Sequence, residues 1–361
     1  MPQRTKLYHR DQVNRPVIGI SMGDPLGIGP EVVVKALSDL SLRQRASFVI
    51  YGDNECLLEA AERAQIHPTW FRVASKSVGE ELPMFGDVTV IDYEIIAQLP
   101  GTRGPSREGG FASKCFVEDA IIDALRLPGH QRRIDAIVTA PISKDSWYRA
   151  AYKWPGHTEL FAARTRAKHH AMAFTSPRLR VALATSHIAL MEVRNVLTIG
   201  RVHDPIVLGH EFCQQLGIPK PRIAVCGLNP HAGEHGLFGD EEQRIIKPAI
   251  DAAQHAGIDA HGPFPGDTIF IEAAAGKWDL VVAMYHDQGL IPVKLLGFDK
   301  AVNVTLGLPI VRTSPDHGTA FGIAGKNLAS ENSMKAAIEL AIDMANFRLN
   351  PAGMQLAQPR R

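Results

Sequence analysis

The 361-residue chain lacks the features that would direct it to nucleic acid, to a membrane or to secretion. Neither sign of charge is in excess, because 39 Lys and Arg residues nearly balance 38 Asp and Glu residues. This balance disfavours a nucleic-acid or membrane-surface protein, since both usually need a basic excess. No apolar run approaches the ~20 residues that span a bilayer. Residues 1–15 have no apolar segment of the kind found in secretory signals, and we expect a loose extension there.

Cysteine is also scarce, and none of the four cysteines forms a CxxC pair. Each lies in an apolar context, which favours a buried thiol over a disulfide or a metal ligand. We therefore expect the protein in a reducing compartment, the cytoplasm. The four are Cys56, Cys115, Cys213 and Cys226.

Short apolar runs alternate with helical patterns along the whole chain, without an internal repeat or a low-complexity linker. The strand-like runs are 16–22, 47–52, 87–92, 134–141, 181–187, 222–230, 279–286 and 301–307. The helical patterns are 30–37, 54–65, 113–126, 239–257 with an interruption at Pro248, and 330–349. This alternation predicts an α/β protein with a largely parallel sheet and helices on both faces. The length suits two domains, and we expect an irregular tail after Asn350.

Three of the strand-like runs carry a histidine at or just past the carboxyl end, namely His187, His231 and His286. Ligands of open α/β sheets bind beyond the carboxyl ends of the strands. Three neutral imidazoles converging there would hold a divalent metal and leave positions open for substrate. A single histidine after a strand is more often a hydrogen-bonded loop residue, so the spacing alone leaves both interpretations open. The pair His169–His170 follows no such run and is set aside.

Nitrogen ligands restrict the choice of metal. Three neutral nitrogens suit Zn, Co, Ni, Fe or Mn better than Ca, which prefers oxygen. Such an ion can polarise a hydroxyl or a carbonyl, or activate water.

Two further segments could contact an anion or a substrate. The stretch GDPLGIGPE (23–31) joins a strand to a helix whose N-terminus could receive an anion, but Val32 stands where GxGxxG needs its third glycine. A structural turn is the simpler interpretation. His157 and Thr158 open a helix after Pro155, where they could bind a ligand or only cap the helix.

Polar residues also occur in the apolar segments near the C-terminus. Lys294, Asn303 and Arg312 would suit a phosphate or a carboxylate, although each taken singly is more often an ordinary surface residue. Asp267 precedes another apolar run and could be a catalytic or metal-supporting carboxylate, or a plain helix or turn cap.

Eight strings between about residue 17 and about residue 345 form a recognisable set: SMGDPLGIGPEVVVKAL, VTAPISK, PGHTE, ATSHIAL, GLNPHAGEHGLFGDEE, GPFPGDTIF, YHDQGLIPVK and RTSPDHGTAFGIAGK. In these strings and their order, the chain resembles the 4-hydroxythreonine-4-phosphate dehydrogenase family of vitamin B6 biosynthesis. That family is related to the isocitrate and isopropylmalate dehydrogenases. Residues 317–326, HGTAFGIAGK, are similar to the loop that holds the adenosine end of the nicotinamide cofactor in those enzymes.

The resemblance implies a two-domain α/β/α subunit of the isocitrate/isopropylmalate dehydrogenase type, and a homodimer with an active site shared between subunits. We expect one domain at 1–145 plus 296–361, carrying the nucleotide-binding loop. We expect the other at 146–295, carrying the metal ligands and the dimer interface.

Carried over position by position, the resemblance assigns a role to each matching residue. The implied metal ligands are His187, His231 and His286, for Zn or alternatively Mg, Co, Mn or Ni. The implied substrate-binding residues are His157, Thr158, Lys294, Asn303 and Arg312. The implied residues for NAD or NADP are His317, Gly318, Thr319, Ala320 and Gly325.

The implied reaction is oxidation of the secondary hydroxyl of 4-hydroxythreonine-4-phosphate, in pyridoxal phosphate biosynthesis. The metal would lower the pKa of the hydroxyl, Lys294 or Asp267 would take its proton, and the hydride would reduce NAD(P)+. The β-keto acid would lose CO2 and leave 3-amino-2-oxopropyl phosphate. One position departs from the pattern, because Gly322 stands where an aspartate that binds the adenosine ribose is common.

Other activities remain compatible with the same residues. Relatives oxidise 4-phosphothreonate or 4-phosphoerythronate, which would give dihydroxyacetone phosphate, and another branch acts on a cyclic dihydrodiol dicarboxylate. A three-histidine zinc site with an open position could instead hydrolyse an ester, since zinc-bound water has a pKa of about 7.

Overall fold

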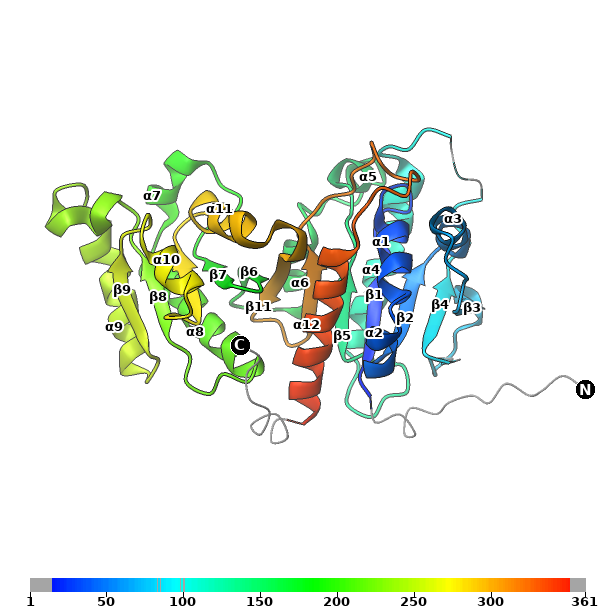
Figure 1. The fold of residues 1–361 in the computed structure, drawn as a ribbon, viewed down its shortest axis with the longest axis horizontal. Helices are drawn as coiled ribbons and strands as arrows, with labels where there is room; N and C mark the ends of the chain where they lie inside the picture. The colour runs from blue at the N-terminus through cyan, green and yellow to red at the C-terminus, as the bar shows by residue number, and fades with distance from the viewer. Residues whose placement is uncertain (1–14, 83, 85, 98, 100, 351–361) are drawn as a thin grey trace, which may run out of the picture. The chain divides into compact units, whose positions relative to one another are not determined.

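The computed structural model describes residues 15–350, except 83, 85, 98 and 100. The expected extension, apart from Arg15, and the expected tail after Asn350 therefore lie outside the described residues. Contacts between residues divide the chain into two units. Figure 1 labels the helices and strands of both. Unit 1 comprises the described residues up to Arg166 together with Pro309–Leu349, and unit 2 comprises Ala167–Leu308.

Unit 1 contains six strands in the order β3-β4-β2-β1-β5-β12, and all its strand pairs are parallel. The strands are β1 (Val17–Ser21), β2 (Ser47–Gly52), β3 (Phe71–Ala74), β4 (Val88–Asp92), β5 (Ala136–Thr139) and β12 (Val311–Pro315). The helices are α1 (Gly29–Leu37), α2 (Leu40–Arg45), α3 (Asn54–Ala64), α4 (Arg107–Ala124), α5 (Lys144–Arg149), α6 (His157–Thr165) and α12 (Asn332–Leu349). Every residue of β1, β2, β4, β5 and β12 is buried, so both faces of these strands are covered.

Unit 2 contains six strands in the order β11-β6-β7-β10-β8-β9. The strands are β6 (Ala171–Ser176), β7 (Leu179–Leu183), β8 (Ile223–Cys226), β9 (Ala260–Phe264), β10 (Leu280–Ala283) and β11 (Val302–Leu306). The helices are α7 (Val193–Val196), α8 (Ile199–Gln215), α9 (Lys247–His255), α10 (Ile269–Ala274) and α11 (His286–Gly297). Strand β6 runs antiparallel to both neighbours, whereas β7, β10, β8 and β9 are parallel.

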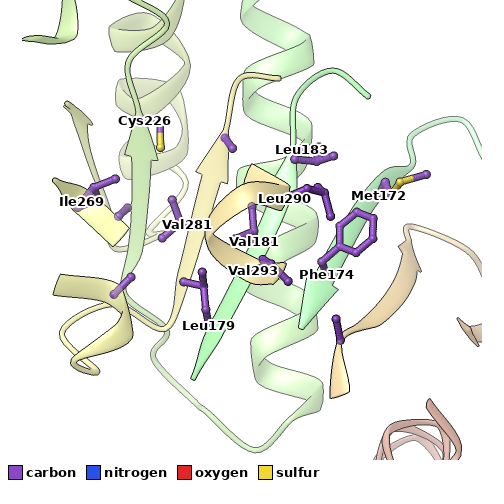
Figure 2. Packing of buried hydrophobic residues seen from close by; sticks show 14 residues of the cluster. Met172, Phe174, Leu179, Val181, Leu183, Cys226, Ile269, Val281, Leu290 and Val293 are labelled. Atoms are coloured by element: carbon purple, nitrogen blue, oxygen red, sulfur yellow. The ribbon is translucent and has the colours of Figure 1, made fainter. Parts of the chain in front are cut away.

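The core of unit 2 follows the two-residue period of its strands (Figure 2). Leu179, Val181 and Leu183 point from β7 to one face, where Leu290 and Val293 of α11 pack with them. This packing fixes α11 on the sheet. Its first residue, His286, is separated from the end of β10 only by Met284 and Tyr285. No helix among the described residues is both long enough and apolar enough to cross a membrane.

The structure confirms the predicted α/β class and most of the predicted elements, with some differences in extent. The strand predicted at 181–187 ends at Leu183, so His187 stands in the loop beyond it. Pro248 does not interrupt the helix predicted at 239–257, because it occupies the first turn of α9 after a π-helical turn, Glu242–Ile246. The hydrophobic patterns did not predict the strands β3, β6, β9 and β12.

The two contact units differ in extent from the predicted domains, 1–145 plus 296–361 and 146–295. Residues 146–166 belong to unit 1 and residues 296–308 to unit 2. The assignment of functional domains stays a prediction.

The four cysteines are free thiols, as expected. Three of them are buried, and Cys115 is partly buried.

Candidate active site

Three neighbouring parallel strands of unit 2, β7, β10 and β8, precede the three histidines. Their carboxyl ends lie at the same edge of the sheet, as Leu183 and Cys226 show in Figure 2. The rings of His187 and His286 lie close together there, with a centroid separation of 5.7 Å and an interplanar angle of 41°. The structure therefore brings two of the three predicted ligands together within one chain.

His231 follows β8 in a loop of unusual backbone conformation. Residues 231–236 all have positive φ, between 44° and 99°, and four of these six are not glycine. Left-handed backbone costs roughly 1–2 kcal/mol for each such residue, so the surrounding structure must hold the loop. Glu242 holds the segment that leads into the loop, because its Oε1 accepts hydrogen bonds from the N–H groups of Leu228 and Asn229, both at 2.7 Å.

The structure does not place His231 with the other two histidines. Within the described part of the chain, no group of three or more His, Cys, Asp or Glu side chains is close enough to hold a metal ion. His231 instead contacts Glu234 and the ring of Phe238, 5.9 Å away between centroids.

Two of the predicted ligands have a carboxylate partner on the nitrogen that a metal would not use. His286 Nδ1 lies 2.7 Å from Asp287 Oδ1, and His231 Nδ1 lies 2.9 Å from Glu234 Oε2. Metal-binding histidines commonly donate their second ring N–H to such a partner, which fixes the tautomer and leaves Nε2 for the metal. The donor chemistry of the histidines thus fits a transition-metal ion.

Arg312 brings a buried positive charge to unit 1. It lies on β12, is 3% exposed, and donates from Nε and Nη2 to Thr139 Oγ1 at 3.2 and 2.7 Å. Its guanidinium lies 5.7 Å from the ring centroid of Phe161. Burial lowers the pKa of Arg312 to about 10, so the side chain is still charged near neutral pH. A buried guanidinium of this kind can bind a phosphate or a carboxylate.

His157 and Thr158 are the first two residues of α6, also in unit 1. The Nε2 atom of His157 is buried and has no hydrogen-bond partner among the described residues. Burial, together with the charge of Arg312, holds the pKa of His157 well below its usual value. The neutral imidazole therefore offers a buried nitrogen to a polar ligand.

Lys294 and Asn303 belong to unit 2. Asn303 lies on β11, and its buried Oδ1 has no hydrogen-bond partner among the described residues. Lys294 is half-buried on α11, eight residues after His286. Asp267 is exposed in the turn before α10.

The predicted cofactor loop, 317–326, packs against the glycine-rich stretch 23–31. The Ile28 N–H donates to the Thr319 carbonyl at 2.9 Å. A Cβ on Gly27 would lie 3.0 Å from atoms of Thr319, so this glycine permits the close approach. His317 resembles His157 in having a buried Nε2 without a partner among the described residues.

Sequence reasoning missed residues that support the histidine-bearing strand ends. Glu242, Thr185 and Gln288 hydrogen-bond to backbone groups at or just beyond these ends. The only feature of the sequence that pointed to any of these residues was the polar run after β10, Tyr285 to Gln288, which includes Gln288.

Comparison with known proteins assigns the chain to a family. The model of the family described as pyridoxal phosphate biosynthetic protein PdxA matches residues 44–341. The chain belongs to this family. It is 45% identical to 4-hydroxythreonine-4-phosphate dehydrogenase of Beijerinckia indica, over 90% of this chain and 94% of that protein. It is equally 45% identical to D-threonate 4-phosphate dehydrogenase of Salmonella typhimurium, over 91% of this chain and 98% of that protein.

A solved structure of the family has the same fold. The 4-hydroxythreonine-4-phosphate dehydrogenase of Klebsiella pneumoniae matches with a TM-score of 0.79 and 38% identity, over 92% of this chain and 99% of that one. The family resemblance drawn from the motifs is thereby confirmed. These relatives are named dehydrogenases, and none of the names supports the alternative of a zinc hydrolase.

Proposed function

We propose that this protein is a metal-dependent NAD(P) dehydrogenase that oxidises the secondary hydroxyl of a phosphorylated four-carbon acid. The proposed substrate is 4-hydroxythreonine-4-phosphate, and D-threonate 4-phosphate is the second candidate, because relatives of both names are 45% identical to the chain. The observation that carries the metal dependence is the pair His187–His286 at the ends of two parallel strands.

A divalent cation bound by His187, His231 and His286 would act as a Lewis acid that makes the secondary hydroxyl easier to deprotonate. NAD or NADP, held by residues 317–326, would accept the hydride. Lys294 or Asp267 would take the proton from the hydroxyl oxygen. The oxidised β-keto acid would then lose CO2 and leave 3-amino-2-oxopropyl phosphate from the amino substrate, or dihydroxyacetone phosphate from the threonate substrate.

The remaining residues bind and orient the substrate. Arg312, and Lys294 where Asp267 is the base, would bind its phosphate and carboxylate through charge-assisted hydrogen bonds. His157 is neutral, so it would hydrogen-bond the substrate without adding charge. The amide of Asn303 and the hydroxyl of Thr158 would form further hydrogen bonds to the substrate. The buried, unpaired polar atoms of His157 and Asn303 support this assignment, because such atoms usually have a partner.

We propose a homodimer in which both subunits build each metal site. The α11 region exposes three large apolar residues at helical spacing, Ile291 at 58%, Leu295 at 81% and Phe298 at 72%. An apolar face of this kind is typical of a protein–protein interface. Because His187 and His286 lie together in one chain, His231 is the ligand we assign to the partner subunit.

The expected reducing cytoplasm is part of this proposal. Its support is the free, mostly buried state of the four cysteines.

The experiment is a substrate panel with purified, Zn-loaded protein, in which reduction of NAD and of NADP is followed by absorbance. The panel contains 4-hydroxythreonine-4-phosphate, D-threonate 4-phosphate and 4-phosphoerythronate. We expect reduction with at least one of them, and loss of that activity after chelation. Absence of reduction with every substrate and both cofactors would contradict the proposal.

A further inference from the structure

Gln288 joins the carboxyl ends of two histidine-bearing strands. The Met284 N–H, just after β10, donates to Gln288 Oε1 at 2.7 Å. Gln288 Nε2 donates to the Gly227 carbonyl, just after β8, at 2.8 Å. One end of the side chain must accept and the other must donate, and an amide meets both requirements. This explains why a glutamine follows the buried strand β10 so closely.

Thr185 joins the third strand to the same point. It lies two residues before His187, is 4% exposed, and donates from its hydroxyl to the Met284 carbonyl at 2.6 Å. Met284 is therefore held through its N–H by Gln288 and through its carbonyl by Thr185. The two side chains together connect β8, β10 and β7 just beyond their carboxyl ends.

Gln288 also supports the turn that carries Asp267. A Cβ on Gly266 would lie 2.8 Å from Gln288 Nε2, so the backbone of this turn packs directly on the amide. A side chain at position 266 would displace either the turn or the glutamine.

We propose that Thr185 and Gln288 are positioning residues of the metal site. Thr185 holds the strand ends of His187 and His286, two ligands of one site, in fixed register. Gln288 holds this pair relative to the strand end of His231, the ligand that the same chain gives to the second site of the dimer. The inference rests on the proposed function, because it takes His187, His231 and His286 as the ligands. Neither positioning residue would contact the metal. The distance between zinc and a histidine nitrogen lies in a narrow range, about 2.0–2.1 Å. Small shifts of a strand end therefore weaken metal binding.

The test measures Co²⁺ binding by the variant Gln288→Met. Methionine keeps the length of the side chain but lacks both the carbonyl oxygen and the NH2 group of the amide. The dissociation constant comes from competition with a chromophoric chelator, and the visible spectrum of bound Co²⁺ reports its coordination. We expect affinity to fall about 10-fold or more, the usual effect of removing a group that supports metal ligands. The spectrum should change as well.

The matched control is Gln254→Met. Gln254 also donates from Nε2 to a backbone carbonyl, that of Ala260, at 2.7 Å. Ala260 is at the amino end of β9, whereas the proposed ligands follow the carboxyl ends of the strands parallel to it. The variant Gln254→Met also loses a hydrogen bond from a side-chain amide to the backbone, but at a place where it supports no proposed metal ligand. Its Co²⁺ affinity and spectrum should therefore equal those of the wild type.

Thr185 provides a second, independent comparison. Thr185→Val removes the hydroxyl with little change of shape, and Thr185→Ser keeps it. We expect weaker Co²⁺ binding for the valine variant and recovery for the serine variant. If Gln288→Met fails to fold, the comparison of Thr185→Val with Thr185→Ser still tests the positioning role.

Two results would overturn the inference. If the wild type binds Co²⁺ and both Gln288→Met and Thr185→Val bind it with the same affinity and spectrum, the positioning role is wrong while the metal site stands. If the wild type itself binds no Co²⁺, the proposed ligand set is wrong and the positioning role falls with it.

Discussion

At the scale of single residues, Gly322 sets an expectation about the cofactor. A Cβ at this position would meet nothing within 4 Å, so an aspartate can be introduced without a clash. A carboxylate there would accept hydrogen bonds from ribose hydroxyls and repel a 2′-phosphate. We predict that Gly322→Asp raises the ratio of kcat/KM for NAD to kcat/KM for NADP.

The control for this prediction is Gly322→Asn, which has nearly the same size and no charge. It should shift the ratio less than the aspartate does. An unchanged ratio in Gly322→Asp would mean that the loop does not contact the ribose in this protein.

His157 gives a prediction about pH. Burial and the charge of Arg312 lower its pKa, so it is neutral in the folded protein, whereas it takes up a proton in the unfolded chain below about pH 6.5. Falling pH therefore favours the unfolded chain. We predict that the wild type loses stability relative to His157→Gln between pH 7.5 and pH 5, by at most about 1.4 kcal/mol per pH unit.

The measurement is urea unfolding of both proteins at several pH values, in the presence of a chelator. All other titrating groups are common to the two proteins, so their difference isolates His157. A difference in the free energy of unfolding that stays constant across this range would contradict the account.

At the scale of elements, α11 connects the core of unit 2 to the site. Leu290 is 3% exposed and packs on the sheet one turn after His286. We predict that Leu290→Ala lowers the free energy of unfolding by about 2–5 kcal/mol, because it leaves a cavity beneath the helix. Ile271→Ala is the control, since Ile271 is 71% exposed on α10 and should cost far less. Urea unfolding measures both, and equal effects would show that Leu290 does not anchor α11.

The elements also show where sequence reasoning was sufficient and where it was not. Hydrophobic patterns located β7, β8 and β10, and therefore the edge at which His187 and His286 meet. They missed β12, whose residues Arg312 to Ser314 look polar, because the pairing with β5 and the cover of α12 decide that this segment is a buried strand. They also missed the left-handed loop at His231, since the buried carboxylate that holds the segment leading into it, Glu242, lies 11 residues after His231.

At the scale of the whole molecule, the shared metal site predicts which pairs of inactive subunits can restore activity. If His187 and His286 come from one subunit and His231 from its partner, a mixed dimer of His187→Ala and His231→Ala has one site with both lesions and one intact site. Random mixing makes about half the dimers mixed, so roughly a quarter of wild-type activity should return. A mixture of His187→Ala and His286→Ala should restore none.

The measurement is activity after the two subunits are expressed together, with mixed dimers demonstrated by different affinity tags. If no pair of histidine variants restores activity although mixed dimers form, each site is built within a single chain. Recovery with the pair His187→Ala and His286→Ala would mean that these two ligands come from different subunits.

The most direct test of the account is the metal content of His286→Ala measured together with its turnover. Loss of this imidazole removes half of the close histidine pair, so we predict that bound metal and turnover both disappear. His169→Ala is the control, because His169 also has a carboxylate partner, Asp204 at 2.8 Å, and lies outside the proposed ligand set. It should keep both. Wild-type turnover by metal-free His286→Ala would contradict the account.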